Sequence, residues 1–169
     1  MGQARLEPSF REFFKSLNAT RVRYLVLGGY AVNFYGYQRY TKDLDVWVAI
    51  DGENCARLSK ALMEFGGFSA RQVSPDRLAE KGAIFVIGRE PLRIDVINDP
   101  KGVDFDECWV RRMDTEIDGV AVPFIALDDL RLNKLKVARP QDLVDAAKLP
   151  DRWPIKPAVR KTRKRRPKV

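Results

Sequence analysis

Hydrophobic positions along the chain follow two different spacings, which change from one segment to the next. Apolar residues three and four apart predict amphipathic helices, over residues 8–17, 54–65, 105–112, 128–137 and 140–148. Short apolar or alternating runs predict strands, over residues 23–27, 44–50, 83–87 and 92–97. A short helix over residues 30–35 follows the first strand, and Asp118-Gly119 marks a hairpin turn within residues 115–122. Together these elements predict an α+β fold with a small mixed sheet and helices around it.

Two aspartates, Asp43 and Asp45, interrupt this pattern at the start of the strand predicted over residues 44–50. Successive strand side chains point to opposite faces, so both carboxylates share one face, about 7 Å apart, while Leu44 and Val46 line the other. Like charges on one surface repel and raise each other's pKa unless a cation lies between them. Aspartate is also depleted in strands, and such conflicts with local propensity tend to mark functional sites.

A third aspartate, Asp95, alternates in the same way with Ile94 and Val96. If its strand neighbours the strand of Asp43 and Asp45, three carboxylates meet on one face. Carboxylate oxygens are the ligands that hard cations such as Mg²⁺ and Mn²⁺ prefer. The competing interpretation is that all three are ordinary solvent-facing residues of half-buried strands.

The chain contains no histidine. This excludes a Ser-His-Asp or Cys-His catalytic arrangement and a zinc site of the usual Cys/His kind. Chemistry must therefore rest on carboxylates, lysine, arginine, hydroxyls or a metal held by oxygen. The two cysteines, Cys55 and Cys108, lack metal-ligand spacing and are expected to be buried free thiols.

A glycine pair, Gly28-Gly29, follows the first predicted strand and precedes a short helix. Glycine permits close approach and backbone conformations that a Cβ would block, and a helix start presents free N–H groups that favour a phosphate. A Gly-Gly pair by itself is more often a plain turn. Here residues 30–42 separate it from Asp43, which is enough for a short helix and a return to an adjacent strand, so a phosphate cradle would open beside the carboxylates.

The net charge of +8 is concentrated at the C-terminus. Residues 156–168 hold eight basic residues and no acid, and the rest of the chain holds 23 basic and 23 acidic residues. We therefore expect a single domain over residues 1–153 and a basic, disordered tail over residues 154–169. The tail would either bind RNA electrostatically or act only as a solubilising segment. The sequence lacks a membrane-length apolar run and the apolar core of a signal peptide, so we expect a cytoplasmic protein without membrane contact.

At this point the motifs resemble a known superfamily. Gly28-Gly29, then Arg39-x-Thr41-x-Asp43-x-Asp45 and a later strand aspartate are similar to the nucleotidyltransferase superfamily of polymerase-beta type. More narrowly, GGYAVNFYGYQRYTKDLDVWV together with LNKLKVARPQDLVDAAKL resembles small bacterial nucleotidyltransferase-like proteins related to the AbiEii toxins of toxin–antitoxin systems. The match spans roughly residues 24–149. It implies a nucleotidyltransferase fold: α+β, with a small mixed, mostly antiparallel sheet flanked by helices, and C-terminal helices.

The resemblance also implies a reaction, the transfer of a nucleoside monophosphate from an NTP to an acceptor. Asp43 and Asp45 would hold the ions, Mg²⁺ or Mn²⁺, that bridge the triphosphate. Asp95 would complete the metal site and activate the acceptor hydroxyl. Gly28 and Gly29 would contact the phosphates.

Four further residues match the second motif of the family: Lys134, Arg139, Asp142 and Asp145. Lys134 would neutralise triphosphate charge, and Arg139 would either bind phosphate or pair with Asp142 across the helix start. For Asp142 and Asp145 we favour a structural role, since an acid in a first helical turn is stabilised by the helix dipole.

Arg39 and Thr41 precede the carboxylates on the same side of the strand, where they either position those acids or touch the nucleotide. Several tyrosines crowd this region and serve either base stacking or, for most of them, core packing: Tyr30, Tyr35, Tyr37 and Tyr40.

These observations leave two classes of function open. The first is a metal-dependent nucleotidyltransferase whose acceptor is RNA such as a tRNA end, a protein or a small molecule, and which belongs to a toxin–antitoxin pair. The second is a non-catalytic antitoxin-like or nucleic-acid-binding protein on the same fold. A degenerate site would be expected to lose at least one of its three aspartates, which favours the enzyme.

Overall fold

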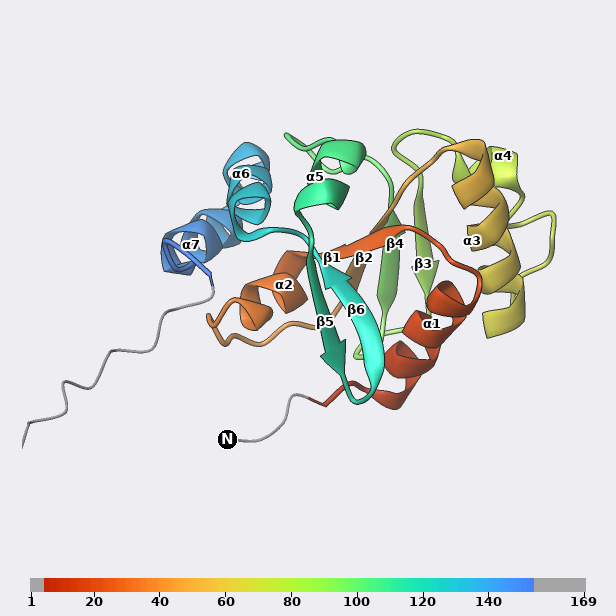
Figure 1. Cartoon of the computed structure of the whole chain (residues 1–169), viewed down its shortest axis with the longest axis horizontal. Helices are drawn as coiled ribbons and strands as arrows, with labels where there is room; N and C mark the ends of the chain where they lie inside the picture. Colours follow the sequence, from red (N-terminus) through yellow and green to blue (C-terminus); the bar gives the residue numbers. More distant parts are fainter. Residues whose placement is uncertain (1–4, 154–169) are drawn as a thin grey trace, which may run out of the picture.

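The computed structural model describes residues 5–153 and contains one six-stranded sheet with helices on its faces and ends (Figure 1). The strand order is β3-β4-β2-β1-β6-β5. The pairs β2/β4 and β1/β6 are parallel, and the other three pairs, including the central pair β1/β2, are antiparallel. The predicted mixed, mostly antiparallel sheet is therefore confirmed, whereas the predicted basic tail lies outside the described residues.

The strands are short and match the predicted runs closely: β1 Tyr24–Leu27, β2 Leu44–Val48, β3 Ile84–Ile87, β4 Ile94–Ile97, β5 Met113–Ile117 and β6 Val120–Phe124. The helices are α1 Pro8–Ala19, α2 Gly28–Phe34, α3 Gly52–Phe65, α4 Pro75–Leu78, α5 Phe105–Arg111, α6 Leu127–Val137 and α7 Pro140–Lys148. The sequence did not predict α4, because a single turn is too short to show a helical repeat of apolar residues. Within the described residues, no helix has the length and apolar character that crossing a bilayer requires.

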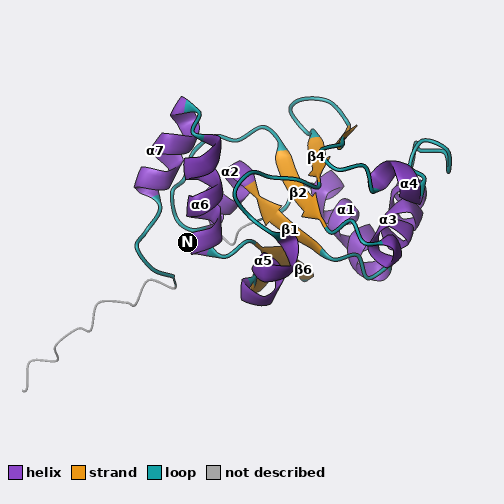
Figure 2. Ribbon diagram, turned by 90° about the horizontal axis from the view of Figure 1, so that it is seen from above, coloured by secondary structure: helices purple, strands orange, loops and turns teal. Residues whose placement is uncertain are grey.

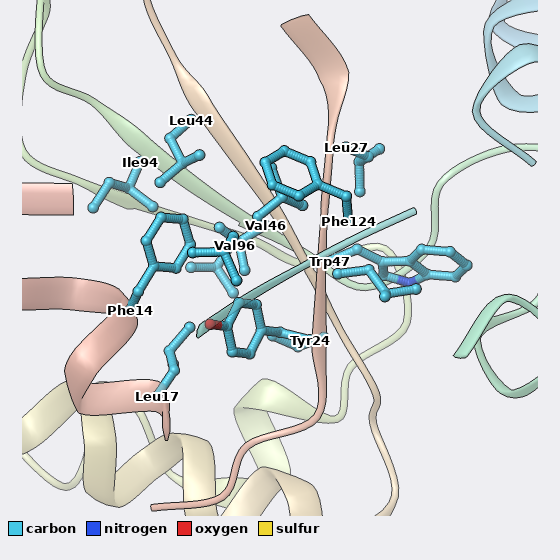
Figure 3. Close-up of a cluster of buried hydrophobic side chains, with 14 of the residues drawn as sticks. Phe14, Leu17, Tyr24, Leu27, Leu44, Val46, Trp47, Ile94, Val96 and Phe124 are labelled. Atoms are coloured by element: carbon cyan, nitrogen blue, oxygen red, sulfur yellow. The ribbon is translucent and has the colours of Figure 1, made fainter. Parts of the chain in front are cut away.

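The main core lies between one face of the sheet and the helices α1 and α3. Alternation along β2 and β4 directs Leu44, Val46 and Val96 into this core, where they pack near Phe14 and Leu17 of α1 (Figure 3). The aromatic stripe of α1 is buried as its spacing predicts. Cys55 and Cys108 are free and buried, which confirms that prediction.

The alternation that fills this core places the other residues of the strands on the opposite face. That face carries Asp45 of β2 and Asp95 of β4, which are register partners. Helices α6 and α7 lie at one end of the molecule, while α1, α3 and α4 lie toward the other (Figure 2). The polar face thus remains open beside α6 and α7, where the candidate site forms.

Candidate functional site

The Gly28-Gly29 pair forms the first residues of α2, directly after β1, so the helix begins two residues earlier than predicted. Gly28 has a φ of +68°, a left-handed conformation that favours glycine. Leu27 pairs with Asp45 on the neighbouring β2. A Cβ on Gly28 would lie 2.1 Å from the Asp45 Oδ2 atom. The chain therefore needs a glycine here both for its backbone and for the close approach of a carboxylate.

Gly29 is constrained by a different pair of side chains. A Cβ at this position would lie 2.3 Å from Thr41 Oγ1 and 3.2 Å from a guanidinium nitrogen of Arg39. The two glycines therefore hold the start of α2 against three residues of the predicted site: Arg39, Thr41 and Asp45. The contact between these glycines and the segment from Arg39 to Asp45 requires the chain to return to the start of α2 after about ten residues.

Asp45 and Asp95 lie side by side, because β2 and β4 are parallel neighbours and these two residues are register partners. The pKa of the partly buried Asp45 is raised to about 6, first by burial and then by the negative charges of Asp95 and Asp43. Positive charges at Lys134 and Arg139 offset only part of this effect. The condition predicted from sequence, carboxylates meeting across neighbouring strands, is met.

A fourth residue, Arg93, bridges two of these carboxylates. Its Nη2 atom donates to Asp43 Oδ2 at 2.7 Å and to Asp95 Oδ2 at 3.1 Å, and its Nε atom donates to Asp95 Oδ1 at 2.9 Å. Arg93 is not among the residues predicted from the sequence. The strand period of two would have found it, since residue 93 falls on the same face as residue 95.

Asp43, Asp45 and Asp95, together called the sheet carboxylates below, fit a divalent metal in their chemistry. They offer oxygen donors only, and Asp43 Oδ1 is buried without a hydrogen-bond partner among the described residues. Their mutual repulsion is the electrostatic condition that a divalent cation relieves. Within residues 5–153, however, no three acidic or other ligating side chains already converge in the geometry of a metal site. Arg93 occupies both oxygens of Asp95 and one oxygen of Asp43, so an ion held by all three carboxylates requires the contacts to Asp95 to loosen.

A second charged group ties α6 and α7 to the segment that precedes β2. Lys134 Nζ lies 3.0 Å from Asp142 Oδ1 and 2.9 Å from Asp145 Oδ2. Arg39 donates two hydrogen bonds of 2.8 Å to the Asp145 carboxylate, from Nε to Oδ1 and from Nη2 to Oδ2. Arg139 Nε donates to Asp142 Oδ2 at 2.7 Å, which is one of the two roles that the sequence leaves open for this arginine. These five residues are called the helix network below.

The carboxyls of the helix network behave oppositely to Asp45. Asp142 and Asp145 are almost fully buried, and burial alone would raise the pKa of each. Hydrogen bonds from Arg139 and Lys134 outweigh burial and hold the pKa of Asp142 below its usual value, and those from Arg39 and Lys134 do the same for Asp145. This arrangement supports the structural role expected for both acids.

Both charged groups border one cleft of about 920 Å³. All nine residues proposed from sequence as catalytic, nucleotide-binding or metal-binding line it: Gly28, Gly29, Arg39, Thr41, Asp43, Asp45, Asp95, Lys134 and Arg139. Lys134 reaches the cleft wall, but its charge is already paired within the helix network. Of the four tyrosines, the exposed Tyr40 lines the cleft, while Tyr35 is buried and its hydroxyl donates to the Ile125 carbonyl oxygen.

Three solved structures share this arrangement of elements. A candidate nucleotidyltransferase from Thermotoga maritima superposes with a TM-score of 0.53 at 18% identity, covering 82% of this chain and 88% of the other. An antigenic nucleotidyltransferase-like protein from Paracoccidioides brasiliensis gives 0.51 at 13% identity, with 85% and 75% covered. The antibiotic-resistance factor ANT(2'')-Ia gives 0.51 at 12% identity, with 83% and 80% covered. No protein-family model matches the sequence, and comparison with curated proteins gives no significant match. The chain thus has the nucleotidyltransferase fold, as predicted.

Proposed function

We propose that this protein is a metal-dependent nucleotidyltransferase that moves a nucleoside monophosphate from an NTP to an acceptor. One observation carries the proposal: the Gly28-Gly29 start of α2 is packed against Asp45, at the point where Asp45 meets Asp95 across two parallel strands. This joins a glycine turn suited to phosphate with carboxylates suited to a divalent cation, in one cleft and on the nucleotidyltransferase fold.

Asp43 and Asp45 would hold the metal ions, and Asp95 would complete their oxygen ligands. Magnesium or manganese bound there would neutralise triphosphate charge and stabilise the charge that develops on the transferred phosphoryl group. The raised pKa of Asp45 supports this assignment, because a carboxyl that lacks counter-charge gains most from a bound cation.

The reaction joins the acceptor oxygen to the α-phosphorus and breaks the bond between that phosphorus and the bridging oxygen, so pyrophosphate leaves. Gly28 and Gly29 would let the triphosphate approach the backbone closely. Asp95 would take the proton of the acceptor hydroxyl. Thr41 and Arg39, which lie against Gly29, would position the nucleotide together with Arg139, and both arginines are held by the helix network.

The acceptor would be RNA, a protein or a small molecule. One structural neighbour is an antibiotic-resistance factor, which keeps a small molecule among the candidates. The basic residues 156–168 favour RNA such as a tRNA end on grounds of charge. A role in a toxin–antitoxin pair, with a partner protein, rests on the resemblance to AbiEii-related sequences. The cytoplasmic location stays a prediction from the hydrophobic pattern of the sequence.

The test is label transfer by the full chain. The purified protein is incubated with Mg²⁺ or Mn²⁺, each α-labelled NTP in turn, and RNA, protein and small-molecule fractions of a bacterial lysate. Label should enter one fraction with the wild type but not with Asp43→Ala or Asp45→Ala. Asp99→Asn is the matched control, since Asp99 lines the same cleft outside the sheet carboxylates and should leave transfer intact.

Equal labelling by wild type and Asp45→Ala would contradict the proposal. Absence of label, together with absence of metal-dependent NTP binding, would favour the second candidate function, a non-catalytic protein on this fold. The observation behind that candidate is that Arg93 already bridges two of the three carboxylates.

A further inference from the structure

Arg93 stands in an unusual place for a cation, at the centre of a site whose carboxylates are proposed to bind metal. It precedes β4 and lies across from Asp43, as the hydrogen bond from the Leu44 amide to the Arg93 carbonyl oxygen shows. Its guanidinium binds Asp95 through two nitrogens and Asp43 through one of the same two. The fork geometry of an arginine makes such contacts specific as well as strong.

The bridge is selective among the three acids. Arg93 binds the carboxylates of Asp43 and Asp95, whereas no hydrogen bond or ion pair to the Asp45 carboxylate occurs among the described residues. Asp43 Oδ1 also stays without a partner. In the part of the chain that the structure describes, Arg93 is therefore the one cation bonded to any of these three carboxylates. It relieves the repulsion between Asp43 and Asp95, but it leaves carboxylate oxygens of Asp43 and Asp45 without a partner.

We propose that Arg93 is a resident counter-ion that makes metal binding depend on the triphosphate. A free divalent ion entering the site meets the guanidinium, and its attraction to the carboxylates is reduced by like-charge repulsion and by the cost of breaking the arginine hydrogen bonds. A metal ion that arrives with a triphosphate brings a partner for the displaced arginine, since a guanidinium binds phosphate oxygens as well as it binds carboxylates.

The surroundings of Arg93 allow this exchange. Its side chain is 33% exposed and lines the same cleft as Gly28 and Gly29, so it is not locked into the core. This inference rests on the proposed function of the site and adds a property to it: metal and triphosphate bind cooperatively. The triphosphate binds the displaced Arg93, and the metal ion neutralises the carboxylates that would otherwise repel the triphosphate.

The experiment measures Mn²⁺ binding to the full chain by equilibrium dialysis against Mn²⁺ alone and against Mn²⁺ with inorganic triphosphate, so that Mn²⁺ bound by triphosphate in solution is equal on both sides and only the excess on the protein side is counted. Wild type should bind Mn²⁺ weakly alone and more tightly with triphosphate. Arg93→Met should lower the Kd for Mn²⁺ alone roughly tenfold or more and shrink the gain that triphosphate gives. Arg93→Lys keeps the charge without the fork and should fall between the two.

Arg112→Met is the matched control. Arg112 contacts Asp114 at the same two-residue spacing, 3.0 Å from Nε to Oδ1, and lies outside the cleft. The variant loses the same charge from the chain and should leave the Kd for Mn²⁺ unchanged. Adding Asp45→Asn to Arg93→Met should abolish the tightened binding, which shows that the ion binds at the sheet carboxylates. Circular dichroism and thermal unfolding establish that each variant is folded.

Two outcomes overturn the inference and separate it from the proposed function. In the first, wild type binds Mn²⁺ in the presence of triphosphate, but folded Arg93→Met binds Mn²⁺ alone no more tightly than wild type does. Arg93 then supports the carboxylates instead of competing with metal, and the proposed function stands. If neither wild type nor any variant binds Mn²⁺ under either condition, the inference and the proposed metal site fail together.

Discussion

Two groups of acidic side chains border the same cleft, and they differ in how many cations each one holds. The sheet carboxylates are three acids, of which one arginine bridges two, Asp43 and Asp95. The helix network sets two acids against three cations, one lysine and two arginines. The pKa of Asp45 is raised, while the pKa values of the more deeply buried Asp142 and Asp145 are lowered.

Cationic partners, and not burial alone, therefore decide whether the pKa of a buried carboxyl is raised or lowered. Asp145 is fully buried, yet its charged form is stabilised, because Lys134 and Arg39 together contact both of its carboxylate oxygens. Asp45 is less buried but short of counter-charge. A saturated group can hold helices in place, whereas an unsaturated one is prepared to bind a cation from solution.

The largest predicted effect comes from removing the cation at the centre of the helix network. Lys134→Met leaves Asp142 and Asp145 buried with one partner fewer each. Breaking a buried ion pair by deleting one partner costs about 3–5 kcal/mol, because an uncompensated charge stays behind. We expect a loss of this size in the free energy of unfolding, measured by urea denaturation at neutral pH.

Lys148→Met is the control for this loss, since Lys148 is exposed on the adjoining helix α7 and should cost less than about 0.5 kcal/mol. If Lys134→Met lowers the free energy of unfolding by less than about 1 kcal/mol, the helix network does not stabilise the fold as a buried ion-pair network. The proposed difference between the two groups would then be wrong.

The second prediction concerns Gly28, where the backbone touches the sheet carboxylates. Gly28→Ala should cost about 2–4 kcal/mol, because alanine is strained at a φ of +68° and its Cβ would collide with Asp45. Gly119→Ala separates these causes, since Gly119 has a φ of +76° and open space around the added carbon. It should cost only the backbone strain, about 1–2 kcal/mol. Equal losses in chemical denaturation would rule out the collision.

The third prediction uses the opposite pH behaviour of the two groups. Asp45→Asn should stabilise the metal-free fold by about 3 kcal/mol above pH 6, since the wild-type carboxyl is charged there at a cost. Between the ordinary pKa of 3.8 and about 6 the folded state binds a proton that the unfolded state releases, so this gain shrinks as pH falls. Unfolding measured at pH 7.5, 5.5 and 4.5 tests it.

Asp114→Asn, on an exposed position of β5, is the control for the substitution itself and should change the free energy of unfolding at pH 7.5 by less than about 0.5 kcal/mol. The acids of the helix network should show the reverse trend: their lowered pKa values stabilise the fold above their ordinary pKa, and this contribution is lost as pH falls through the folded values. A stability difference between wild type and Asp45→Asn that does not change with pH would contradict the raised pKa.

The sequence revealed the sheet carboxylates more fully than it revealed the helix network. Alternation along β2 and β4 places Asp45 and Asp95 on the face opposite the core, and that inference needs only the strand period and their adjacency. The bond from Arg39 to Asp145 joins positions 106 residues apart, which no local period encodes. Arg93 is intermediate: its face was readable from alternation, but its choice of Asp43 and Asp95 depends on strand register.

The smallest predicted effect tests whether the helix network has a dispensable member. The Arg139 side chain is 74% exposed, and its partner Asp142 keeps the contact from Lys134. An exposed partner contributes little, so Arg139→Ala should cost at most about 1 kcal/mol in urea denaturation, well below Lys134→Met. If Arg139 also binds the nucleotide, the variant should raise KM for the NTP several-fold with kcat nearly unchanged, which is the pattern of lost uniform binding. A loss of stability as large as that of Lys134→Met would show that the exposed arginine, not the buried lysine, neutralises Asp142, and the network would then respond to solvent and salt much as the open carboxylates do.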